Sequence, residues 1–333
     1  MSGVAAFIVL HNHATTLRAT LAALAAQTAT PTRLVVVDNA SNDASLALVR
    51  EFAAPLSVEI VAWPANRGFS AAANEAIRRT DEPWVLALNP DCRLAPDFIE
   101  VLLGAARDER IGAATGLLLR AHGGELAAAA AVDSAGMVVT AAGRHLDRGA
   151  GGPLRRRWER PAWVFGASGA AALYRRAALE DIAYPAGEVF DEGFFAYRED
   201  ADLAWRLQRR GWRCLYWPAA RAWHARGLKP ELARRGTPEV NRHSVRNRFL
   251  LRWANADWRW RFACFPWWLL RDTAVVAACL TVERSSRAGL VEAWAMRRRQ
   301  RARGVANASR ALASGWTVAR WFLPGGQTRR IDD

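Results

Sequence analysis

A regular alternation of strand-like and helix-like segments over residues 4–91 constrains the fold of this chain more than any other feature. Apolar runs typical of buried strands occupy 4–10, 33–37, 58–62 and 84–88, and segments with helical periodicity occupy 15–27, 45–52 and 70–79. Strands and helices that alternate at this spacing favour a mostly parallel sheet with right-handed crossovers and helices on its faces. The predicted fold class is therefore α/β.

Polar side chains follow three of these strands at the point where each strand ends. His11 and Asn12 follow the first strand, Asp38 and Asn39 the second, and Asp91 the fourth. Ligands of open α/β sheets bind at the carboxyl ends of the strands, so we expect a binding site there. A GxGxxG motif does not follow the first strand, which argues against a dinucleotide-binding fold of the dehydrogenase type.

Two motifs in the first half have both a functional and a structural interpretation. In VVVDNASNDAS, Asp38 could accept a hydrogen bond from a pyrimidine base, or it could form an Asx turn that caps the next helix. In ANRGFSAAANEA, backbone N–H groups at a helix start could hold a diphosphate beside Arg67 and the small Gly68, or Ser70 could simply cap the helix.

The segment 190–224 gathers acidic and aromatic residues. Glu199, Asp200 and Asp202 lie in the first turn of a predicted helix that ends at Gly211, and the following CLYW predicts a short strand closed by Pro218. These carboxylates could supply a general base, or they could be a solvated helix N-terminus. Upstream, 136–140 and 143–146 predict a hairpin, and 163–176 predicts one strand that passes through a tight glycine turn.

A metal site is predicted around Asp91 in the motif LNPDCRL. A carboxylate at a strand end binds hard cations through oxygen, but a single carboxylate gives a weak site. His224 is the candidate for the second ligand, and the alternative is a histidine packed beside Trp223.

The amino-acid composition limits the kinds of partner, metal site and location that we expect for this chain. The formal net charge of +14 suits nucleic acid, anionic lipid or phosphorylated substrates. The four cysteines form no CxxC pair, so neither a zinc site nor a disulfide framework is implied. The N-terminus has no basic region before its apolar run, so no signal peptide is expected and a cytosolic location is the default.

The C-terminal third, 251–333, is a basic, tryptophan-rich helical extension to a main domain predicted at 1–250. It holds 15 arginines against 6 acids and 8 of the 16 tryptophans. Within it, 262–282 is interrupted by Arg271 and Asp272, so we expect this stretch to lie in the interface of an anionic membrane rather than to span it. The alternative is an ordinary helical cap with a basic outer face.

Four ordered motifs resemble those of family-2 inverting glycosyltransferases with the GT-A fold, above all the rhamnosyltransferase-like members that build bacterial surface polysaccharides. They are VVVDNASNDAS, NRGFSAAANEA, LNPDCRL and FDEGFFAYREDADLAWRLQRRGW…AWH, and the resemblance covers roughly residues 4–255. It implies a GT-A sheet with a nucleotide-sugar donor, dTDP-rhamnose favoured, and a glycan or polyprenyl-diphosphate-linked acceptor. Together with the basic C-terminal third, a lipid-linked acceptor predicts a cytoplasmic protein that is peripheral on the inner face of the cell membrane.

The resemblance also implies roles for individual residues. Asp91 and His224 would hold Mg²⁺ or Mn²⁺, and the Glu199–Asp200 pair would supply the base, with Asp200 favoured. The nucleotide-sugar site would comprise His11, Asn12, Asp38, Asn66, Arg67, Gly68, Asn74, Asn89 and Asp91. Sugar or acceptor contacts would come from Gly166, Ala167, Asp191, Glu192, Phe195 and Tyr197.

The chain departs from the family pattern in three places. Asn89 stands where DxD has its first aspartate, and His11–Asn12 replaces the usual Tyr-Asn. The QxxRW signature of processive synthases is absent, which implies transfer of single residues. Two other classes remain as alternatives, a nucleotidyltransferase and a nucleic-acid-binding protein. Arginines and aromatics crowd into the C-terminal third rather than lining the strand ends, so no nucleic-acid partner is expected.

Overall fold

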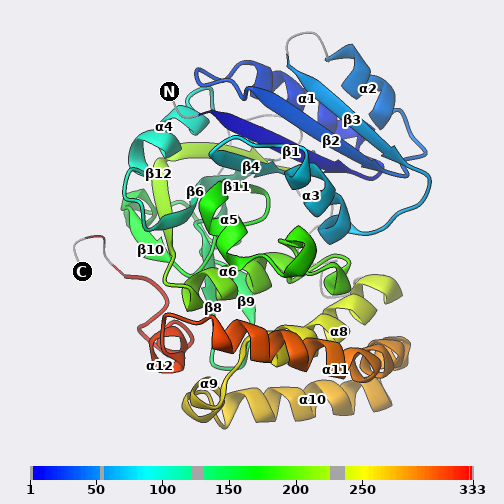
Figure 1. Ribbon diagram of the computed structural model, residues 1–333, viewed down its shortest axis with the longest axis vertical. Coiled ribbons are helices and arrows are strands. Elements are labelled where there is room, and N and C mark those ends of the chain that lie inside the picture. Colours follow the sequence, from blue (N-terminus) through cyan, green and yellow to red (C-terminus); the bar gives the residue numbers. More distant parts are fainter. Residues whose placement is uncertain (1–2, 53–55, 122–130, 226–236, 330, 332–333) are drawn as a thin grey trace.

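The computed structural model describes residues 3–52, 56–121, 131–225, 237–329 and 331 (Figure 1). In these residues one ten-stranded, mostly parallel sheet runs through the molecule, with helices on its faces and a layer of further helices below it. The main strand order is β10-β12-β6-β11-β4-β1-β2-β3. The α/β prediction is confirmed.

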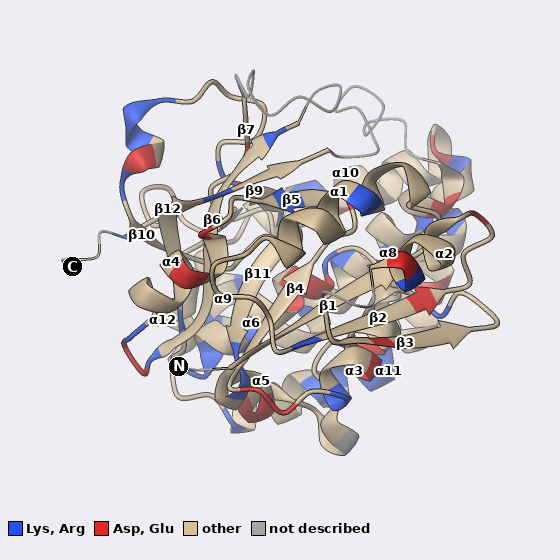
Figure 2. Ribbon diagram, turned by 90° about the horizontal axis from the view of Figure 1, so that it is seen from above, with Lys and Arg blue, Asp and Glu red and all other residues tan. Residues whose placement is uncertain are grey.

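The N-terminal half of the sheet follows the predicted alternation. Its parallel strands are β1 (Val4–Leu10), β2 (Arg33–Asn39), β3 (Val58–Trp63) and β4 (Trp84–Leu88). The connecting helices are α1 (Ala14–Ala25), α2 (Ser45–Glu51) and α3 (Phe69–Arg78). β1 and β4, which are tan throughout in Figure 2, carry no charged residue.

Alternate residues of β2 enter different cores because successive side chains of a strand point to opposite faces. Leu34 and Val36 pack in the cluster that contains the α1 leucines. Val35 and Val37 pack with the alanines of α3 on the other face. The strand is therefore buried on both sides, as its continuous apolar run predicted.

The second half of the sheet is mixed in direction. Antiparallel β11 joins β4 to β6, and β12 runs parallel to β6. Its strands are β5 (Cys92–Leu94), β6 (Ile111–Arg120), β7 (Val132–Ser134), β10 (Ala162–Val164), β11 (Ala171–Arg175) and β12 (Arg213–His224). The accompanying helices are α4 (Phe98–Ala105), η1 (Arg156–Glu159), α5 (Arg176–Ile182), η2 (Pro185–Gly187), η3 (Glu192–Phe194) and α6 (Glu199–Arg209).

Two strand predictions in this half are wrong. Residues 163–176 form the separate strands β10 and β11, because the first pairs with β12 while the second pairs with β4 and β6. Pro218 does not close the last strand. The register of β12 against β6 shifts between Tyr216 and Arg221, and this irregularity accommodates a proline within a strand that continues to His224. The predicted hairpin is confirmed as β8 (Met137–Val139) and β9 (His145–Asp147).

A helical layer follows β12. It comprises α8 (Pro238–Asn255), α9 (Trp258–Ala263), α10 (Trp267–Thr281), η4 (Arg284–Ser286), α11 (Arg287–Ser309) and α12 (Gly315–Ala319). In Figure 1 this layer lies at the end of the molecule farthest from α1 and α2. Trp205 of α6 packs with Trp260 and Phe322 in a third core, which joins the layer to the sheet domain. The predicted division at residue 250 falls within α8 and stays a prediction.

Helix α10 has an unusual pattern of burial. Its buried residues are Asp272 and Cys279, whereas Leu270 is 66% exposed and Trp267 is 50% exposed. Asp272 accepts a hydrogen bond from Arg252 and lies 3.9 Å from Nη1 of Arg248, both on α8. In the described residues no helix is long and apolar enough to cross a membrane.

Candidate active site

Two adjoining cavities open at the carboxyl ends of the parallel strands. The larger cavity, about 660 Å³, is lined by α6, the β8–β9 hairpin and the loop before β11. The smaller cavity, about 390 Å³, is lined by residues that follow β1, β2, β3 and β4 and by the start of α8. The two cavities share the residues Phe69, Asn89, Ala196 and Tyr197.

Asn39, which the sequence placed at the end of the second strand without a specific role, connects the loops around the smaller cavity. Its buried side-chain amide donates to Asn66 Oδ1 (2.8 Å) and accepts from the N–H of Arg67 (2.8 Å). Its carbonyl accepts from Nδ1 of His11 (3.0 Å). One residue at the end of β2 therefore binds both loops, the loop after β1 through its backbone carbonyl and the loop after β3 through its side chain.

Asp38 and Asn12 have local roles in the same region. Asp38 is buried and accepts from the N–H of Ser41 (3.2 Å), a local bond that lies before α2 and does not cap it. Asn12 has a left-handed backbone (φ 61°) and accepts from the N–H of Asn42 (2.8 Å). Neither side chain lines a cavity as the structure stands, and their contacts with a nucleotide stay predictions.

The start of α3 depends on a glycine. Gly68 has φ +85°, and a Cβ added there would lie 2.6 Å from the carbonyl oxygen of Phe195. The same oxygen accepts from the N–H of Ser70 (3.1 Å). The Ser70 hydroxyl is buried and makes no capping bond, so the capping interpretation of Ser70 is wrong.

Asn74 lines neither cavity. Its side chain is fully buried and accepts from the N–H groups of Val189 (3.1 Å) and Phe190 (2.8 Å), and it donates to Phe190 O (2.8 Å) and Glu192 (3.1 Å). These bonds hold α3 to the segment before η3, and the role of Asn74 in the nucleotide-sugar site stays a prediction.

Asp91 and His224 lie side by side, as predicted. Nε2 of His224 is 3.1 Å from Asp91 Oδ1, and Nδ1 donates to Asp133 Oδ2 at 2.8 Å. Burial disfavours a charged imidazole, but hydrogen bonds to Asp133 and Asp91 outweigh it and raise the pKa of His224 to about 9. Asp133 lies on β7 and was not predicted. His13 also lines the smaller cavity, and its buried Nδ1 has no hydrogen-bond partner.

This arrangement fits a divalent cation. A metal-binding histidine commonly donates its other ring N–H to a carboxylate, and Asp133 is placed to receive that bond. A cation would take the place of the Nε2 proton of His224 and would also bind the Asp91 carboxylate. In the described residues no group of three or more His, Cys, Asp and Glu is placed to hold a metal, so oxygen atoms of a substrate would have to complete the site.

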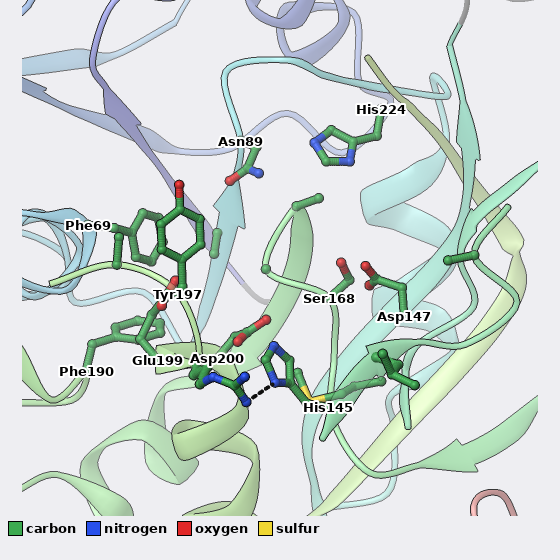
Figure 3. Close-up of a pocket in the computed structure, with 18 of the residues that line it drawn as sticks. Phe69, Asn89, His145, Asp147, Ser168, Phe190, Tyr197, Glu199, Asp200 and His224 are labelled. Atoms are coloured by element: carbon green, nitrogen blue, oxygen red, sulfur yellow. Dashed lines mark hydrogen bonds between the residues drawn. The ribbon is translucent and has the colours of Figure 1, made fainter. Parts of the chain in front are cut away.

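Glu199 and Asp200 face the larger cavity from the first turn of α6, and Asn89 and His224 lie on its opposite side (Figure 3). Burial raises the pKa of both carboxyl groups, with a further contribution from Asp200 to Glu199 and from Asp147 to Asp200. The increase is larger for Glu199, whose buried Oε2 has no hydrogen-bond partner.

Asp202, in the same turn, points away from the cavity. It forms a buried ion pair with Arg206 (2.8 Å) and accepts from Asn255 of α8 (2.7 Å). The acidic helix start therefore divides into two carboxyl groups at the cavity and one that connects α6 to α8.

The segment before α6 separates the two cavities. Phe195, Tyr197 and Arg198 all have positive φ (63°, 70° and 73°), a conformation that is rare for residues other than glycine and that is found at functional sites. This backbone exposes Tyr197 to both cavities. Phe195 lines the smaller cavity and stacks on His243 of α8, with ring centroids 5.0 Å apart.

Four residues predicted to contact sugar or acceptor line neither cavity. Gly166 packs against α6, where a Cβ added to it would lie 2.4 Å from the Cβ of Ala204. The next two residues, Ser168 and Gly169, line the larger cavity, and the sugar or acceptor contacts of Gly166 and Ala167 stay predictions.

Asp191 and Glu192 are also bound elsewhere. Asp191 is fully buried and binds Arg299 (2.9 Å), Arg303 (3.0 Å) and Gln300 (2.8 Å) of α11, and its sugar contact stays a prediction. Glu192 accepts from Asn74, and its sugar or acceptor contact stays a prediction.

Comparison with known proteins adds three findings. The family model described as Glycosyl transferase family 2 matches residues 5–183. The chain is 31% identical over 230 residues to the N-acetylglucosaminyl-diphospho-decaprenol L-rhamnosyltransferase of Mycobacterium tuberculosis, covering 61% of this chain and 70% of the relative. It is 22% identical over 225 residues to the poly-beta-1,6-N-acetyl-D-glucosamine synthase of Staphylococcus aureus, covering 67% and 50%.

Solved structures share the fold at low identity. Residues 1–349 of TarS from S. aureus, in complex with UDP-GlcNAc, superpose with a TM-score of 0.56 at 15% identity, covering 92% of this chain and 89% of that one. The mannosyltransferase PcManGT of Pyrobaculum calidifontis, in complex with GDP-Man and Mn²⁺, gives 0.55 at 17% identity, covering 96% and 85%.

Proposed function

The chain belongs to glycosyl transferase family 2, and on that basis we propose that it transfers one sugar, with inversion, from a nucleotide-diphosphate donor to a hydroxyl group of a glycan or lipid-linked acceptor in bacterial surface-polysaccharide synthesis. Rhamnose from dTDP-rhamnose is the favoured donor because a relative at 31% identity is a rhamnosyltransferase. One observation carries the proposal: the Asp91–His224 pair faces the Glu199–Asp200 pair across a continuous pair of cavities.

The reaction follows from this arrangement. The acceptor hydroxyl oxygen forms a bond to the anomeric carbon while the bond from that carbon to the diphosphate breaks on the opposite face. Asp200 takes the hydroxyl proton. Residues Asn39, Asn66 and His11 shape the site for the nucleotide. Mg²⁺ or Mn²⁺, held by Asp91 and His224, would supply positive charge to the departing diphosphate.

Asp200 is a better base than Glu199. A general base must be deprotonated at working pH, and the pKa of Asp200 is raised less than that of Glu199. Glu199 therefore carries a proton in the neutral range, where it can donate a hydrogen bond to the acceptor.

Release of nucleoside diphosphate over a panel of nucleotide sugars tests the function. We expect turnover with dTDP-rhamnose when a lipid-diphosphate-linked or simple glycoside acceptor is present, and loss of turnover in excess chelator. Turnover with a different donor alone would reject the rhamnose assignment. Release of inorganic diphosphate from a nucleoside triphosphate and a sugar phosphate would instead favour the nucleotidyltransferase alternative.

We also propose that the helical layer contacts an anionic membrane surface on the inner face of the cell membrane. The supporting observation is the pattern of exposure on α9 and α10. Phe262 is 73% exposed and Leu270 is 66% exposed, while the polar Asp272 is turned inward. Exposed apolar and tryptophan side chains beside arginines such as Arg271 suit the interfacial region of a bilayer.

Sedimentation with vesicles tests this surface without truncating the chain. The variant Phe262→Gln/Leu270→Gln is expected to bind anionic vesicles several-fold more weakly than the unmodified protein. Leu154→Gln, which removes an exposed leucine far from α10 in the sequence, serves as the control. If all three proteins sedimented equally, the membrane proposal would fail, and α10 would be the outer face of an ordinary helical cap.

A further inference from the structure

The charges of Arg144, Arg248 and Arg252 act on Arg198 at the larger cavity, and we call these four arginines the arginine cluster. Arg198 lines the cavity and is 8% exposed. Arg144 is exposed in the β8–β9 turn, and Arg248 and Arg252 are buried on α8. None of the mechanistic steps above uses these side chains.

In the part of the chain that the structure describes, few carboxylates form ion pairs with the cluster. Within the described residues, its ion pairs at 4.0 Å or less all go to Asp272, from Arg248 and Arg252. Nη1 of Arg248 and Nη1 of Arg252 are buried with no hydrogen-bond partner. Burial and the neighbouring Arg248 and Arg144 lower the pKa of Arg198 to about 9, with Asp200 opposing, and this still leaves the guanidinium charged at neutral pH.

His145 orients Arg198 without neutralising it. Nη1 of Arg198 donates to Nδ1 of His145 at 3.2 Å, the bond dashed in Figure 3. Burial and the surrounding arginines lower the pKa of His145 to about 3, so the imidazole is neutral. When Nδ1 accepts this bond, the ring proton sits on Nε2, which makes His145 a further donor at the cavity wall.

We propose that the arginine cluster, through Arg198 and Arg144, binds a phosphate group of the acceptor, so that the enzyme takes a sugar linked to its lipid through a diphosphate rather than a neutral glycan. This inference rests on the proposed function. Arginine is suited to phosphate because its planar donors match two oxygens at once. Arg198 directly precedes Glu199 and Asp200, so one segment would hold both the anionic end and the reacting hydroxyl.

The position of the cluster also fits a lipid-linked acceptor. Arg248 and Arg252 connect the cavity side of α8 to Asp272 of α10, the helix whose outer face we propose to contact the membrane. The phosphate site would therefore lie between the catalytic carboxylates and the proposed membrane surface, where a lipid-linked diphosphate would enter.

Two acceptors that carry the same sugar test the proposal. One is joined through a diphosphate to a short polyprenyl chain, and the other is an uncharged alkyl glycoside. We expect Arg144→Gln and Arg198→Gln to lower the ratio of kcat/KM values, diphosphate acceptor over neutral acceptor, by about ten- to hundredfold, the effect of losing a charged hydrogen bond. Arg198→Lys should restore part of the ratio. Arg50→Gln, an exposed arginine on α2, should leave the ratio unchanged.

The other outcomes separate the explanations. An equal loss with both acceptors would overturn the phosphate site and assign Arg198 to positioning Glu199 and Asp200. If the ratio held but Arg144→Gln weakened sedimentation with anionic vesicles, the charge would serve lipid headgroups and the proposal would fail. Inorganic diphosphate should compete with the charged acceptor in the unmodified enzyme and less in Arg144→Gln. If the unmodified protein used neither acceptor with any donor, the proposed function itself would fail.

Discussion

The two cavities differ in how the chain builds them. The smaller cavity is formed mostly by residues at or just after the ends of β1, β2, β3 and β4, and contacts between neighbouring loops such as Asn39 to Asn66 join its polar groups. The larger cavity brings together a hairpin, a loop before β11 and the start of α6 from distant parts of the chain. The comparison shows that one half of the site comes from sheet topology and the other from tertiary packing.

The difference extends to electrostatics. Asp91, on the side of the smaller cavity, has a lowered pKa because hydrogen bonds to His224 outweigh the effect of burial. Glu199 and Asp200, in the larger cavity, have raised pKa values because burial dominates. A charged carboxylate suits binding of a cation, and a carboxylate with a raised pKa suits proton transfer near neutral pH.

The largest expected effect is on the larger cavity. Asp200→Asn should lower kcat by roughly 10²–10⁴-fold, because the hydroxyl proton loses its acceptor, while the Kd of the donor changes little. Steady-state rates and donor titration measure the two quantities. Asp97→Asn, an exposed carboxylate before α4, is the control. Near-normal turnover in Asp200→Asn would move the base to Glu199.

The corresponding test of the smaller cavity concerns Asp133. Asp133→Asn should weaken Mn²⁺ affinity by about 10- to 100-fold, because His224 loses the carboxylate that orients it. Electron paramagnetic resonance of free Mn²⁺, with nucleoside diphosphate present, measures this affinity. Asp81→Asn, an exposed carboxylate before β4, should bind as before. If Asp91→Ala loses the metal and both His224→Ala and Asp133→Asn retain it, then His224 is a core histidine.

The pH dependence of kcat sharpens the electrostatic contrast. Burial and the charge of Asp147 raise the pKa of Asp200 to about 6, above its ordinary 3.8. The base acts in its deprotonated form, so kcat should fall about tenfold per pH unit below that value. A rate that stays constant down to the ordinary aspartate range, about pH 4, would contradict the assignment.

The smallest expected effect is structural and lies where the cavities meet. Gly68→Ala should destabilise the fold by about 1–3 kcal/mol, because alanine disfavours the positive φ and its Cβ would press on the Phe195 carbonyl. Denaturant unfolding measures the change. Gly104→Ala in α4 is the matched control, since its Cβ would meet no atom within 4 Å. Equal stability of the two variants would contradict the prediction and would show that the Phe195 carbonyl can shift away from the added Cβ at little cost.

Much of the smaller cavity was predictable because a strand end is visible in local sequence. Apolar runs locate β1, β2 and β4, and topology then places His11, Asn39 and Asp91 together. Local sequence does not say which way a polar residue faces. It therefore does not reveal that Asn74 binds the backbone of Phe190 or that Asp191 binds Arg299 of α11.

The larger cavity was less predictable because its parts are far apart in sequence. The hairpin was predicted, yet nothing local to it says that His145 and Asp147 face α6. Asp133 follows an alanine-rich stretch, and only the pairing of β7 with β6, beside β12, brings it to His224. The strand through Pro218 was missed because a local rule for proline does not include the irregular register that tolerates it.

The segment of left-handed residues between the cavities has a thermodynamic consequence. Tyr197 borders both cavities, and the carbonyl of Phe195 binds the start of α3. A donor that orders residues 195–198 would therefore also order part of the acceptor site. Linkage requires the effect to be reciprocal: the factor by which donor raises acceptor affinity equals the factor by which acceptor raises donor affinity. The two substrates of this enzyme should therefore bind cooperatively, with a single peptide segment as the element that couples them.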